Sequence, residues 1–496
     1  MAGTSGDDVI EGLDGNDTLR GGAGNDRLVG GAGNDGLIGE SGQDVLSGGS
    51  GDDSYLVDAG DVLIESAGEG RDTVYTATSY ALGAGAEIEV LTAYDRASTN
   101  ALTLNGNEFA NILYGNMGTN GLIGGGGADT LYGLGGDDTY IVDGADQVIE
   151  LAGQGRDTVY ALASHTLLAG AEVEVLTAYD RDGAAAINLT GSATANILYG
   201  NMGTNGLIGG GGSDTLYGLG GDDSYLVDDA SDQVIEAAGQ GRDAVYVLAS
   251  YALLSSSEVE VLTTYDRAGT AAINLTGSAT ANILYGNMGV NGLIGGGGSD
   301  TLYGLGGDDS YIVDDASDSV IELAGQGRDT VYSLGDFVLA AGSEVEVVTA
   351  YDRSGTTALK LTGNALANTI IGNAGANVLD GKGGADTLYG MGGADTFQFS
   401  TELQAGAAPG GIGDFVTGVD RIALDDAVFG ALATGALAAS AFVTGSAAAD
   451  ADDRIIYNSL TGALSYDADG NGAGAAIQFA TLLSHPALAA GDILIF

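Results

Sequence analysis

Large apolar residues recur at every ninth position through the start of the chain, from residue 10 to residue 55. In each copy the apolar residue follows an Asp by two positions and a Gly by seven, so the unit reads G-G-x-G-x-D-x-U-x, with U a large residue. Glycine permits the backbone conformations of tight turns, and strand side chains alternate between faces. The pattern predicts a six-residue turn followed by a three-residue strand that points U inward. The U residues are Ile10, Leu19, Leu28, Leu37, Leu46 and Tyr55.

Two such nonapeptides make one coil, and successive coils are expected to stack at the usual interstrand spacing of about 4.8 Å. The position-six carboxylates of stacked coils then align along the turns, with backbone carbonyls beside them. This predicts an all-β fold, a parallel β-roll or β-helix solenoid. The first six position-six acids are Asp8, Asp17, Asp26, Asp35, Asp44 and Asp53.

A longer repeat follows the first block. Tyr94-Asp95-Arg96 recurs at residues 179–181, 265–267 and 351–353, with spacings of 85, 86 and 86. Four such units fill residues 53–394, and each contains four nonapeptides and a long spacer, such as 56–105. The spacers have alternating apolar and polar positions broken by Gly and Asp, which is typical of short strands. We therefore expect wider coils of the same solenoid; the alternative, a separate catalytic insert, requires four copies of one active site.

Position six divides these later nonapeptides into two types. The last two of each unit carry Asp129, Asp138, Asp214, Asp223, Asp300, Asp309, Asp386 and Asp395. The first two carry Asn111, Asn120, Asn196, Asn205, Asn282, Asn291, Asn368 and Asn377. Carboxylate and carbonyl oxygens are ligands that Ca²⁺ prefers, so the Asp turns predict calcium sites. Because Asn is a neutral ligand, the Asn turns are expected to be weak or empty, with stacked amide ladders as an alternative.

The composition narrows the function. The 496 residues carry a formal charge of −54, with 89 Gly, 2 Pro, 2 His and no Cys, yet 44% are apolar. The charge disfavours nucleic acid and anionic membranes as partners, and missing Cys excludes disulfides and thiolate sites. Neither a secretory signal peptide at the N-terminus nor an apolar span of transmembrane length is visible, so no membrane insertion is expected.

Tyrosines recur at position nine of alternate nonapeptides. One coil of separation predicts stacking on one outer face, either as an aromatic ladder that stabilises the solenoid or as a contact surface for glycan or a neighbouring molecule. These pairs are Tyr114 and Tyr132, Tyr199 and Tyr217, and Tyr285 and Tyr303.

Other repeated polar residues have structural interpretations. Glu87 and Glu89 recur in all four units as a solvated strand face or extra cation ligands, rather than an acid/base pair. Arg71-Asp72 and the Tyr-Asp-Arg motif also recur, and we expect local ion pairs or interface contacts. His165 aligns with Tyr80, Tyr251 and Phe337, which indicates a packing position.

The nonapeptide resembles the RTX (hemolysin-type calcium-binding) repeat, whose known architecture is a β-roll. Residues 395–496 resemble the C-terminal cap and secretion region of serralysin-type and other RTX exoproteins, and an acid followed by an apolar tail at 491–496 resembles a type I secretion signal. Within this region Asp467, Asp469 and Asn471 look like half of an EF-hand loop, without the Glu that would complete it. The predicted domains are 1–57 (six nonapeptides), 58–394 (four solenoid units) and 395–496 (cap and secretion signal).

The resemblance implies several Ca²⁺ ions, extracellular location by way of a Gram-negative type I apparatus, and folding on calcium outside the cell. No zinc-protease motif, lipase elbow or pore-forming region precedes the repeats, so the family's hydrolase and toxin activities are not expected. We predict a non-enzymatic structural protein of a matrix, surface layer or filament that self-assembles end to end or laterally. The alternatives are a calcium-dependent adhesin that binds glycan through the tyrosine face, an exoenzyme, and a calcium-binding passenger fragment of a larger exoprotein.

Overall fold

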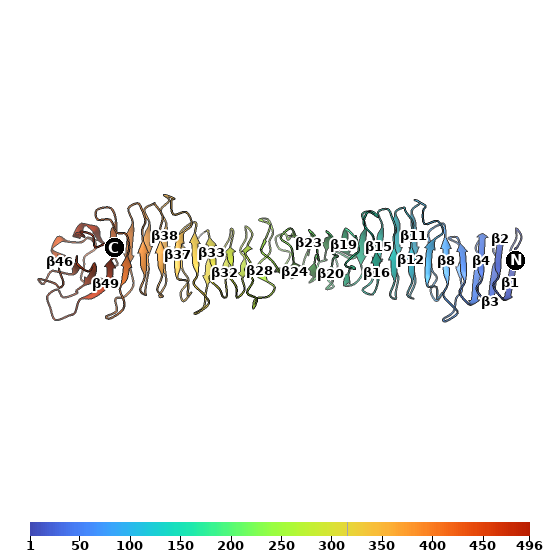
Figure 1. Ribbon diagram of the computed structural model, residues 1–496, viewed down its shortest axis with the longest axis horizontal. Helices are drawn as coiled ribbons and strands as arrows, with labels where there is room; N and C mark the ends of the chain where they lie inside the picture. The colour runs from blue at the N-terminus through green and yellow to red at the C-terminus, as the bar shows by residue number, and fades with distance from the viewer. Residues whose placement is uncertain (315) are drawn as a thin grey trace. The chain divides into compact units, whose positions relative to one another are not determined.

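The structure is a computed structural model that describes residues 1–314 and 316–496. The chain forms two compact units, Met1–Tyr246 and Val247–Phe496. Each unit is a stretch of parallel β-solenoid, in which strands of successive coils stack side by side (Figure 1). The predicted all-β solenoid is therefore confirmed. Among the described residues, no helix combines the length and the apolar character needed to cross a membrane.

Three sheets dominate the unit Met1–Tyr246. The first comprises β1 (Val9–Asp14), β3 (Arg27–Ala32), β5 (Val45–Ser50) and β7 (Val62–Leu63). The second comprises β2 (Thr18–Ala23), β4 (Gly36–Ser41), β6 (Ser54–Val57), β8 (Thr73–Thr76), β10 (Val90–Ala93), β12 (Ile112–Tyr114), β14 (Thr130–Tyr132) and β16 (Gln147–Ile149). The third comprises β9 (Tyr80–Ala81), β11 (Leu102–Asn105), β13 (Asn120–Ile123), β15 (Thr139–Val142), β17 (Thr158–Ala161), β19 (Val175–Ala178), β21 (Ile197–Tyr199), β23 (Thr215–Tyr217) and β25 (Gln233–Val234). The remaining strands here are β18 (His165–Thr166), β20 (Asn188–Thr190), β22 (Gly206–Ile208) and β24 (Ser224–Val227), and β26 (Ala244–Val247) lies at the unit boundary.

The register of the first block follows the nonapeptide. Val9 pairs with Arg27 and Arg27 pairs with Val45, which confirms that two nonapeptides make one coil. Strands in this block are longer than the predicted three-residue strand, because the glycines that open the next nonapeptide also pair: Gly31 lies opposite Gly49. In the later units most nonapeptide strands are shorter.

The spacers continue the solenoid with coils of varied length. Thr73 pairs with Val90 across a coil slightly shorter than two nonapeptides, whereas Tyr80 pairs with Leu104 across a longer one. One sequence unit contains nine strands, from β6 to β14, and therefore four and a half coils. Because nine is odd, equivalent strands of successive units lie in opposite sheets: β6 belongs to the second sheet and its counterpart β15 to the third.

The core consists of the U residues that point between the sheets. Leu19, Leu28, Leu113 and Leu122 have no exposed surface. Burial of such side chains is the main stabilising contribution of each coil, at about 1.5–3 kcal/mol per large apolar side chain.

The unit Val247–Phe496 repeats this arrangement. One of its sheets contains β28 (Val261–Thr264), β30 (Ile283–Tyr285), β32 (Thr301–Tyr303) and β34 (Ser319–Ile321). A second contains β27 (Tyr251–Ala252), β29 (Leu275–Thr276), β31 (Gly292–Ile294), β33 (Ser310–Val313), β35 (Thr330–Ser333), β37 (Val347–Ala350), β39 (Thr369–Ile371), β41 (Thr387–Tyr389), β43 (Gly410–Ile412), β49 (Ile477–Leu482), β48 (Ala463–Tyr466), β47 (Ile455–Asn458) and β46 (Phe442–Thr444). A third contains β36 (Phe337–Val338), β38 (Lys360–Thr362), β40 (Val378–Asp380), β42 (Thr396–Phe399), β44 (Arg421–Leu424), β50 (Ile493–Ile495) and β45 (Gly435–Ala436). Two 3₁₀ turns, η1 (Ala439–Ala441) and η2 (Ala490–Asp492), complete it.

Parallel pairing gives way to antiparallel pairing near the C-terminus. β48 pairs antiparallel with both β47 and β49, and β50 pairs parallel with β44. Phe399, Phe429, Tyr466 and Phe479 pack edge to face beneath these strands, with ring centroids 5.1–5.2 Å apart. The last coils are thus followed by a β-rich region with its own aromatic core.

Candidate calcium-binding turns

The position-six carboxylates form ladders along the turns. The Oδ1 atom of Asp44 accepts a hydrogen bond of 2.7 Å from the backbone N–H of Asp26, the position-six residue one coil earlier. Every predicted acid except Asp8 and Asp17, which lie in the first coil, accepts this bond: Asp26, Asp35, Asp44, Asp53, Asp129, Asp138, Asp214, Asp223, Asp300, Asp309, Asp386 and Asp395.

The second carboxylate oxygen of most of these residues is buried and has no hydrogen-bond donor. A buried anionic oxygen without a hydrogen-bond donor destabilises the fold. A cation bound at each of these oxygens would remove that destabilisation. These orphaned Oδ2 atoms belong to Asp26, Asp35, Asp44, Asp53, Asp129, Asp138, Asp214, Asp223 and Asp309.

Backbone oxygens converge on the same point. A side-chain carbon at Gly30 would collide with both the Oδ2 atom of Asp35 and the carbonyl oxygen of Gly48. The bare glycine therefore leaves room where a carboxylate and a carbonyl oxygen from adjacent coils meet. Hard oxygen donors in a flexible turn are the set that Ca²⁺ takes, and the residues present fit that ion.

The electrostatics agree with this assignment. Burial, reinforced by neighbouring acids, raises the pKa of Asp53 to about 6, of Asp223 and Asp309 to about 7, and of Asp138 to about 8. Without a cation, these carboxyl groups therefore bind protons more tightly than exposed carboxyl groups do.

In the Asn turns, the oxygen and the nitrogen of the side-chain amide both form hydrogen bonds within the protein. Asn111 accepts a 2.8 Å bond from the backbone N–H of Asn107 and donates its amide N–H to the carbonyl of Ile88. Asn120 likewise accepts from Asn116 and donates back to its side-chain oxygen. The amide N–H group of Asn thus supplies the partial positive charge that a bound cation would supply beside an Asp carboxylate. The alternative of amide ladders at position six is wrong for these turns, because one coil beyond Asn111 stands Asp129, and beyond Asn120 stands Asp138.

The ladders extend into the spacers, which the sequence reasoning missed. Asp44 donates its backbone N–H to Asp61, Asp53 to Asp72, and Asp72 to the Oε2 atom of Glu89. The Asp of the Arg-Asp motif is therefore a ladder residue rather than an ion-pair partner of its Arg. Glu89 is half-buried and accepts from the ladder, so it does not belong to a purely solvated face; its alternative role as an extra cation ligand stays a prediction. The recurrence of Asp at coil spacing in the spacers was the available signal.

A second missed set is the Glu that follows the last nonapeptide of each block. Its Oε1 atom accepts a hydrogen bond from the buried Tyr at the U position of that nonapeptide. The pairs are Tyr55 with Glu65, Tyr140 with Glu150, Tyr225 with Glu236 and Tyr311 with Glu322.

Comparison with known families agrees with this geometry. The sequence model for the RTX calcium-binding nonapeptide repeat matches residues 2–37, 35–64, 103–129, 114–146, 188–216, 199–234, 274–302, 285–320 and 362–397. The chain is an RTX calcium-binding repeat protein. RTX nonapeptides bind Ca²⁺ and are typical of secreted proteins, and the match indicates no enzyme family. No curated protein matches the chain.

The paired tyrosines of the RTX coils stack as predicted. Tyr114 and Tyr132 lie 4.6 Å apart between ring centroids, and their rings are inclined by 15°. The guanidinium of Arg96 lies 4.0 Å from the centroid of the Tyr114 ring, and Ile149 follows Tyr132 in register. The same ladder recurs at Arg181, Tyr199 and Tyr217, and at Arg267, Tyr285 and Tyr303. In three of the four copies the Arg of the Tyr-Asp-Arg motif thus stacks on an aromatic ring instead of forming a local ion pair, and the alternative of interface contacts stays a prediction.

The tyrosine pairs do not form one continuous face. Tyr114 lies on β12 and Tyr199 on β21, which belong to opposite sheets of the unit Met1–Tyr246. Since neighbours in the ladder cover the ring faces, these residues are half-buried. The more exposed aromatic residues are those that open the Tyr-Asp-Arg motif, at 54–62% exposure: Tyr94, Tyr179, Tyr265 and Tyr351.

The EF-hand-like segment gathers few acids. Asp467 accepts a 3.3 Å bond from the backbone N–H of Asp469, whose own carboxylate accepts from Gly474, while Asn471 is exposed. Within the described residues, these acids are not among the groups of three that could hold a metal ion. Calcium binding by this segment stays a prediction.

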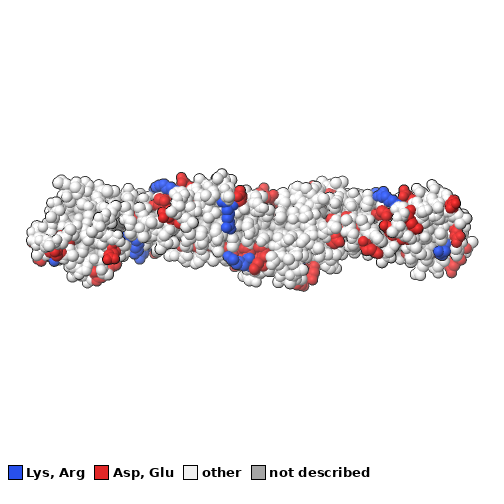
Figure 2. Space-filling model, turned by 90° about the horizontal axis from the view of Figure 1, so that it is seen from below, with Lys and Arg blue, Asp and Glu red and all other residues white. Residues whose placement is uncertain are grey.

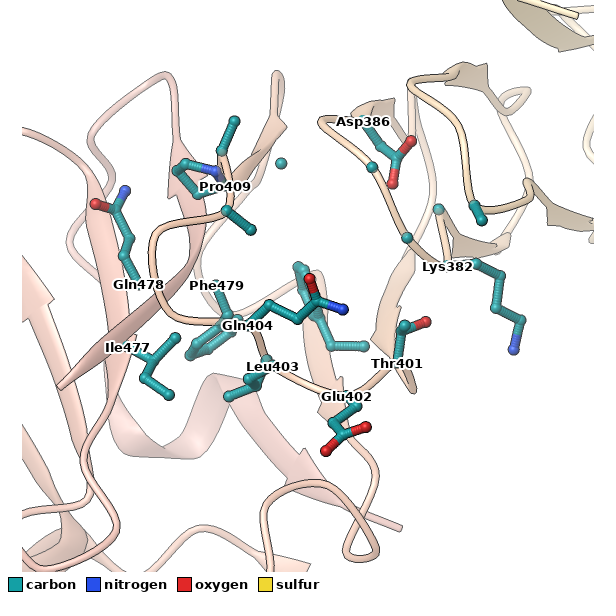
Figure 3. A pocket seen from close by; sticks show the side chains of 18 of the residues that line it. Lys382, Asp386, Thr401, Glu402, Leu403, Gln404, Pro409, Ile477, Gln478 and Phe479 are labelled. Carbon is teal, nitrogen blue, oxygen red and sulfur yellow. The ribbon is translucent and has the colours of Figure 1, made fainter. Parts of the chain in front are cut away.

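One cavity of about 310 Å³ lies between the last nonapeptides and the C-terminal strands (Figure 3). Leu403, Gln404, Ile477 and Phe479 line one side. On the other, Lys382 is engaged by Asp380 at 3.0 Å. The lining mixes apolar and polar side chains, and none of the described residues that line it belongs to a group of three that could hold a metal ion.

The surface is less acidic than the composition suggests. The face drawn in Figure 2 is largely uncharged, with Asp and Glu in separate patches. This follows from the geometry, because the ladder carboxylates point into the turns and most of them are buried.

Proposed function

We propose that this RTX protein is a secreted extracellular structural protein, part of a matrix, surface layer or filament, that folds when it binds calcium outside the cell. The observation that carries this proposal is the ladder of buried carboxylates with one unpartnered oxygen in coil after coil. In such a chain, burial of the unpartnered carboxylate oxygens destabilises the turns unless cations bind there.

The calcium gradient across the cell envelope supplies the switch. Extracellular calcium modules bind at roughly 10⁻⁴–10⁻³ M, so the low Ca²⁺ of a cytosol leaves such turns empty and mutually repulsive. Outside, binding energy becomes folding energy. An unfolded chain suits a type I exporter, and the resemblance of residues 395–496 to RTX exoproteins supports that route.

The half-coil offset between sequence units supports lateral assembly. Within Met1–Tyr246, the exposed Tyr94 and Tyr179 follow β10 and β19, which lie in opposite sheets. Leu162 precedes Tyr179 by one coil and is also half exposed. Equivalent exposed tyrosines therefore face both sides, and a repeated contact that does not close on itself gives extended assemblies.

Negative-stain microscopy and light scattering at millimolar Ca²⁺ test the assembly. We expect extended particles that disappear when Tyr94, Tyr179, Tyr265 and Tyr351 are replaced together by Ser, with circular dichroism unchanged. The matched control replaces four exposed acids that precede the Arg of the same motif: Asp95, Asp180, Asp266 and Asp352, each to Asn. Particles that stay monomeric at high protein concentration would contradict a structural role through self-assembly.

A calcium-dependent adhesin is the second candidate, because exposed tyrosines are rigid amphipathic contacts suited to sugars. The exposed Tyr94 set favours it more than the Tyr114 set, whose ring faces are covered. A glycan array probed with monomeric, calcium-loaded protein separates the two: binding that the four Ser substitutions abolish supports the adhesin, and an array without signal rejects it.

A further inference from the structure

Three carboxylates from separate segments meet at the end of a nonapeptide block. Asp138 is the position-six acid of the last nonapeptide, Glu150 follows β16, and Asp157 precedes β17. One oxygen from each lies within 4.8 Å of the other two, and the side chains are only 1–2% exposed. Two further groups share this arrangement: Asp223, Glu236 and Asp243, and Asp309, Glu322 and Asp329.

Hydrogen bonds hold one oxygen of each of these carboxylates. Oδ1 of Asp138 accepts a 2.6 Å bond from the backbone N–H of Asn120. Tyr140 donates its hydroxyl to Oε1 of Glu150, and Oδ1 of Asp157 accepts a 2.8 Å bond from the backbone N–H of Asp138. A side chain at Gly133 would collide with Oδ2 of Asp138, the Tyr140 hydroxyl and Oε1 of Glu150, so these polar atoms converge over a bare Cα.

The other oxygens are left without a donor. Oδ2 of Asp138, Oε2 of Glu150 and Oδ2 of Asp157 are all buried and unpartnered. In the unit Val247–Phe496, Oδ2 of Asp309 and Oε2 of Glu322 are in the same state. A Tyr–Glu hydrogen bond that served only the packing would need one carboxyl group, and it would not explain two more acids beside it.

The sequence couples the Tyr and the Glu. Four nonapeptides that end a block have Tyr at the U position, and each is followed by its Glu. The fifth has Phe397 instead, and Ala407 and Ala408 stand where the Glu would fall. The hydroxyl and the carboxylate therefore occur together, as expected if both build one site. The first pair, Tyr55 and Glu65, lies outside the three groups that meet within 4.8 Å.

We propose that these three groups are a second class of calcium site, in which spacer carboxylates join the last nonapeptide turn of a block, and that they bind the ion more tightly than the other turns. Only one of the three ligands, such as Asp138, comes from the nonapeptide; the Glu and the second Asp come from the spacer. Ca²⁺ binds oxygens at 2.3–2.6 Å, so oxygens on opposite sides of one ion are up to about 5 Å apart, and affinity rises with the number of charged ligands. These sites fill first and fix the ends of the three blocks that contain them, where the coil length changes. This inference deepens the calcium dependence proposed above and is independent of assembly.

Calorimetric titration of calcium-free protein with Ca²⁺ tests the site directly. The variant E150Q/E236Q/E322Q is expected to lose three Ca²⁺ ions per chain from the tight phase and to keep the weaker phase. The control D180N/D266N/D352N removes three exposed charges and is expected to keep the tight phase. An unchanged tight phase in the Gln variant, or an equal loss in both variants, would overturn the proposal.

Terbium luminescence provides a readout that does not depend on those substitutions. The chain has 23 Tyr and no Trp, so Tyr alone sensitises bound Tb³⁺. With up to three Tb³⁺ per chain, the variant Y140F/Y225F/Y311F is expected to lose most of the sensitised emission. A loss limited to the share of three rings in 23 would place the first ions elsewhere and reject the site. This second test also decides the question if the Gln variant does not fold in saturating Ca²⁺.

Discussion

The Asp turns and the Asn turns differ in their backbone as well as in the residue at position six. The Asp129 turn has positive φ at Gly125 and Gly127, whereas no residue of the Asn111 turn, 106–111, has positive φ. In an Asp turn such as that of Asp129, Oδ1 is bound to the neighbouring coil and Oδ2 is buried without a donor. In an Asn turn such as that of Asn111, that atom is an amide nitrogen that donates to the carbonyl of Ile88. An Asn turn is thus stabilised by its own amide group, whereas an Asp turn requires a bound cation.

This comparison explains why each unit uses both types. In each unit, two Asn turns whose amide groups are hydrogen-bonded within the protein precede two Asp turns that need calcium. The N-terminal block 1–57, where all six nonapeptides carry Asp, is expected to depend on calcium most strongly.

The largest expected effect is that of pH on stability, because the Asp turns titrate and the Asn turns do not. Raised carboxyl pKa values mean that the folded, calcium-free chain binds protons more tightly than the unfolded chain, whose carboxyls titrate near pH 4. This stabilisation is complete below about pH 4 and is lost as the pH rises through 6 to 8, the pKa values of Asp53 and Asp138. Each carboxyl whose pKa rises by one on folding contributes about 1.4 kcal/mol at low pH.

Thermal melts in chelator should therefore show a midpoint that falls steeply from pH 5 to pH 8. In saturating Ca²⁺ the slope should reverse below neutral pH, because protons compete with the ion. Parallel pH profiles with and without calcium would contradict the assignment of the buried acids as ligands.

The second largest effect is expected when Asp turns are converted into Asn turns, because this changes the stability of the calcium-free form relative to the calcium-loaded form. The variant D35N/D44N removes two buried charges, so the calcium-free form should gain about 1–3 kcal/mol per site. The calcium-loaded form should bind fewer ions and lose stability. Urea unfolding in both conditions measures this, with Glu11→Gln as an exposed control. Equal effects in both conditions would show that these carboxylates do not bind calcium.

The reverse change probes an Asn turn. Asn111→Asp loses the amide donor to Ile88 and adds a buried charge, which should cost the calcium-free form about 1–3 kcal/mol. Added calcium should restore part of the loss and raise the number of bound ions. No recovery on calcium would mean that the Asn turns lack the carbonyl geometry of the Asp turns.

The aromatic ladder should give the smallest effect. Arg96→Ala removes a cation–π contact worth about 0.5–1 kcal/mol. Arg353→Ala is a matched control, because Arg353 makes the same bond to Thr349 that Arg96 makes to Thr92 but is followed one coil later by Ile371 rather than Tyr. Equal losses in urea unfolding would assign the effect to the threonine bond.

The periodic part of the fold could be predicted from the sequence, because a nine-residue spacing fixes both the turn and the inward strand position. Leu28 and Asp26 are where the repeat predicts them. The spacer ligands could not be predicted so readily, since coils of unequal length bring Glu150 and Asp157 to Asp138 at spacings that no single period contains. Nor could the opposite placement of equivalent Tyr pairs, which follows from a unit of four and a half coils. The domain division after residues 57 and 394 stays a prediction.

Hydrogen exchange with mass spectrometry, before and after calcium is removed by EGTA, tests the central claim most directly. We expect most β structure to lose protection in chelator at pH 8, first in residues 3–57 and last at the spacer clusters, and circular dichroism to fall in parallel. Protection and circular dichroism unchanged by excess EGTA would show that the buried carboxylates are closed without calcium and would contradict the account.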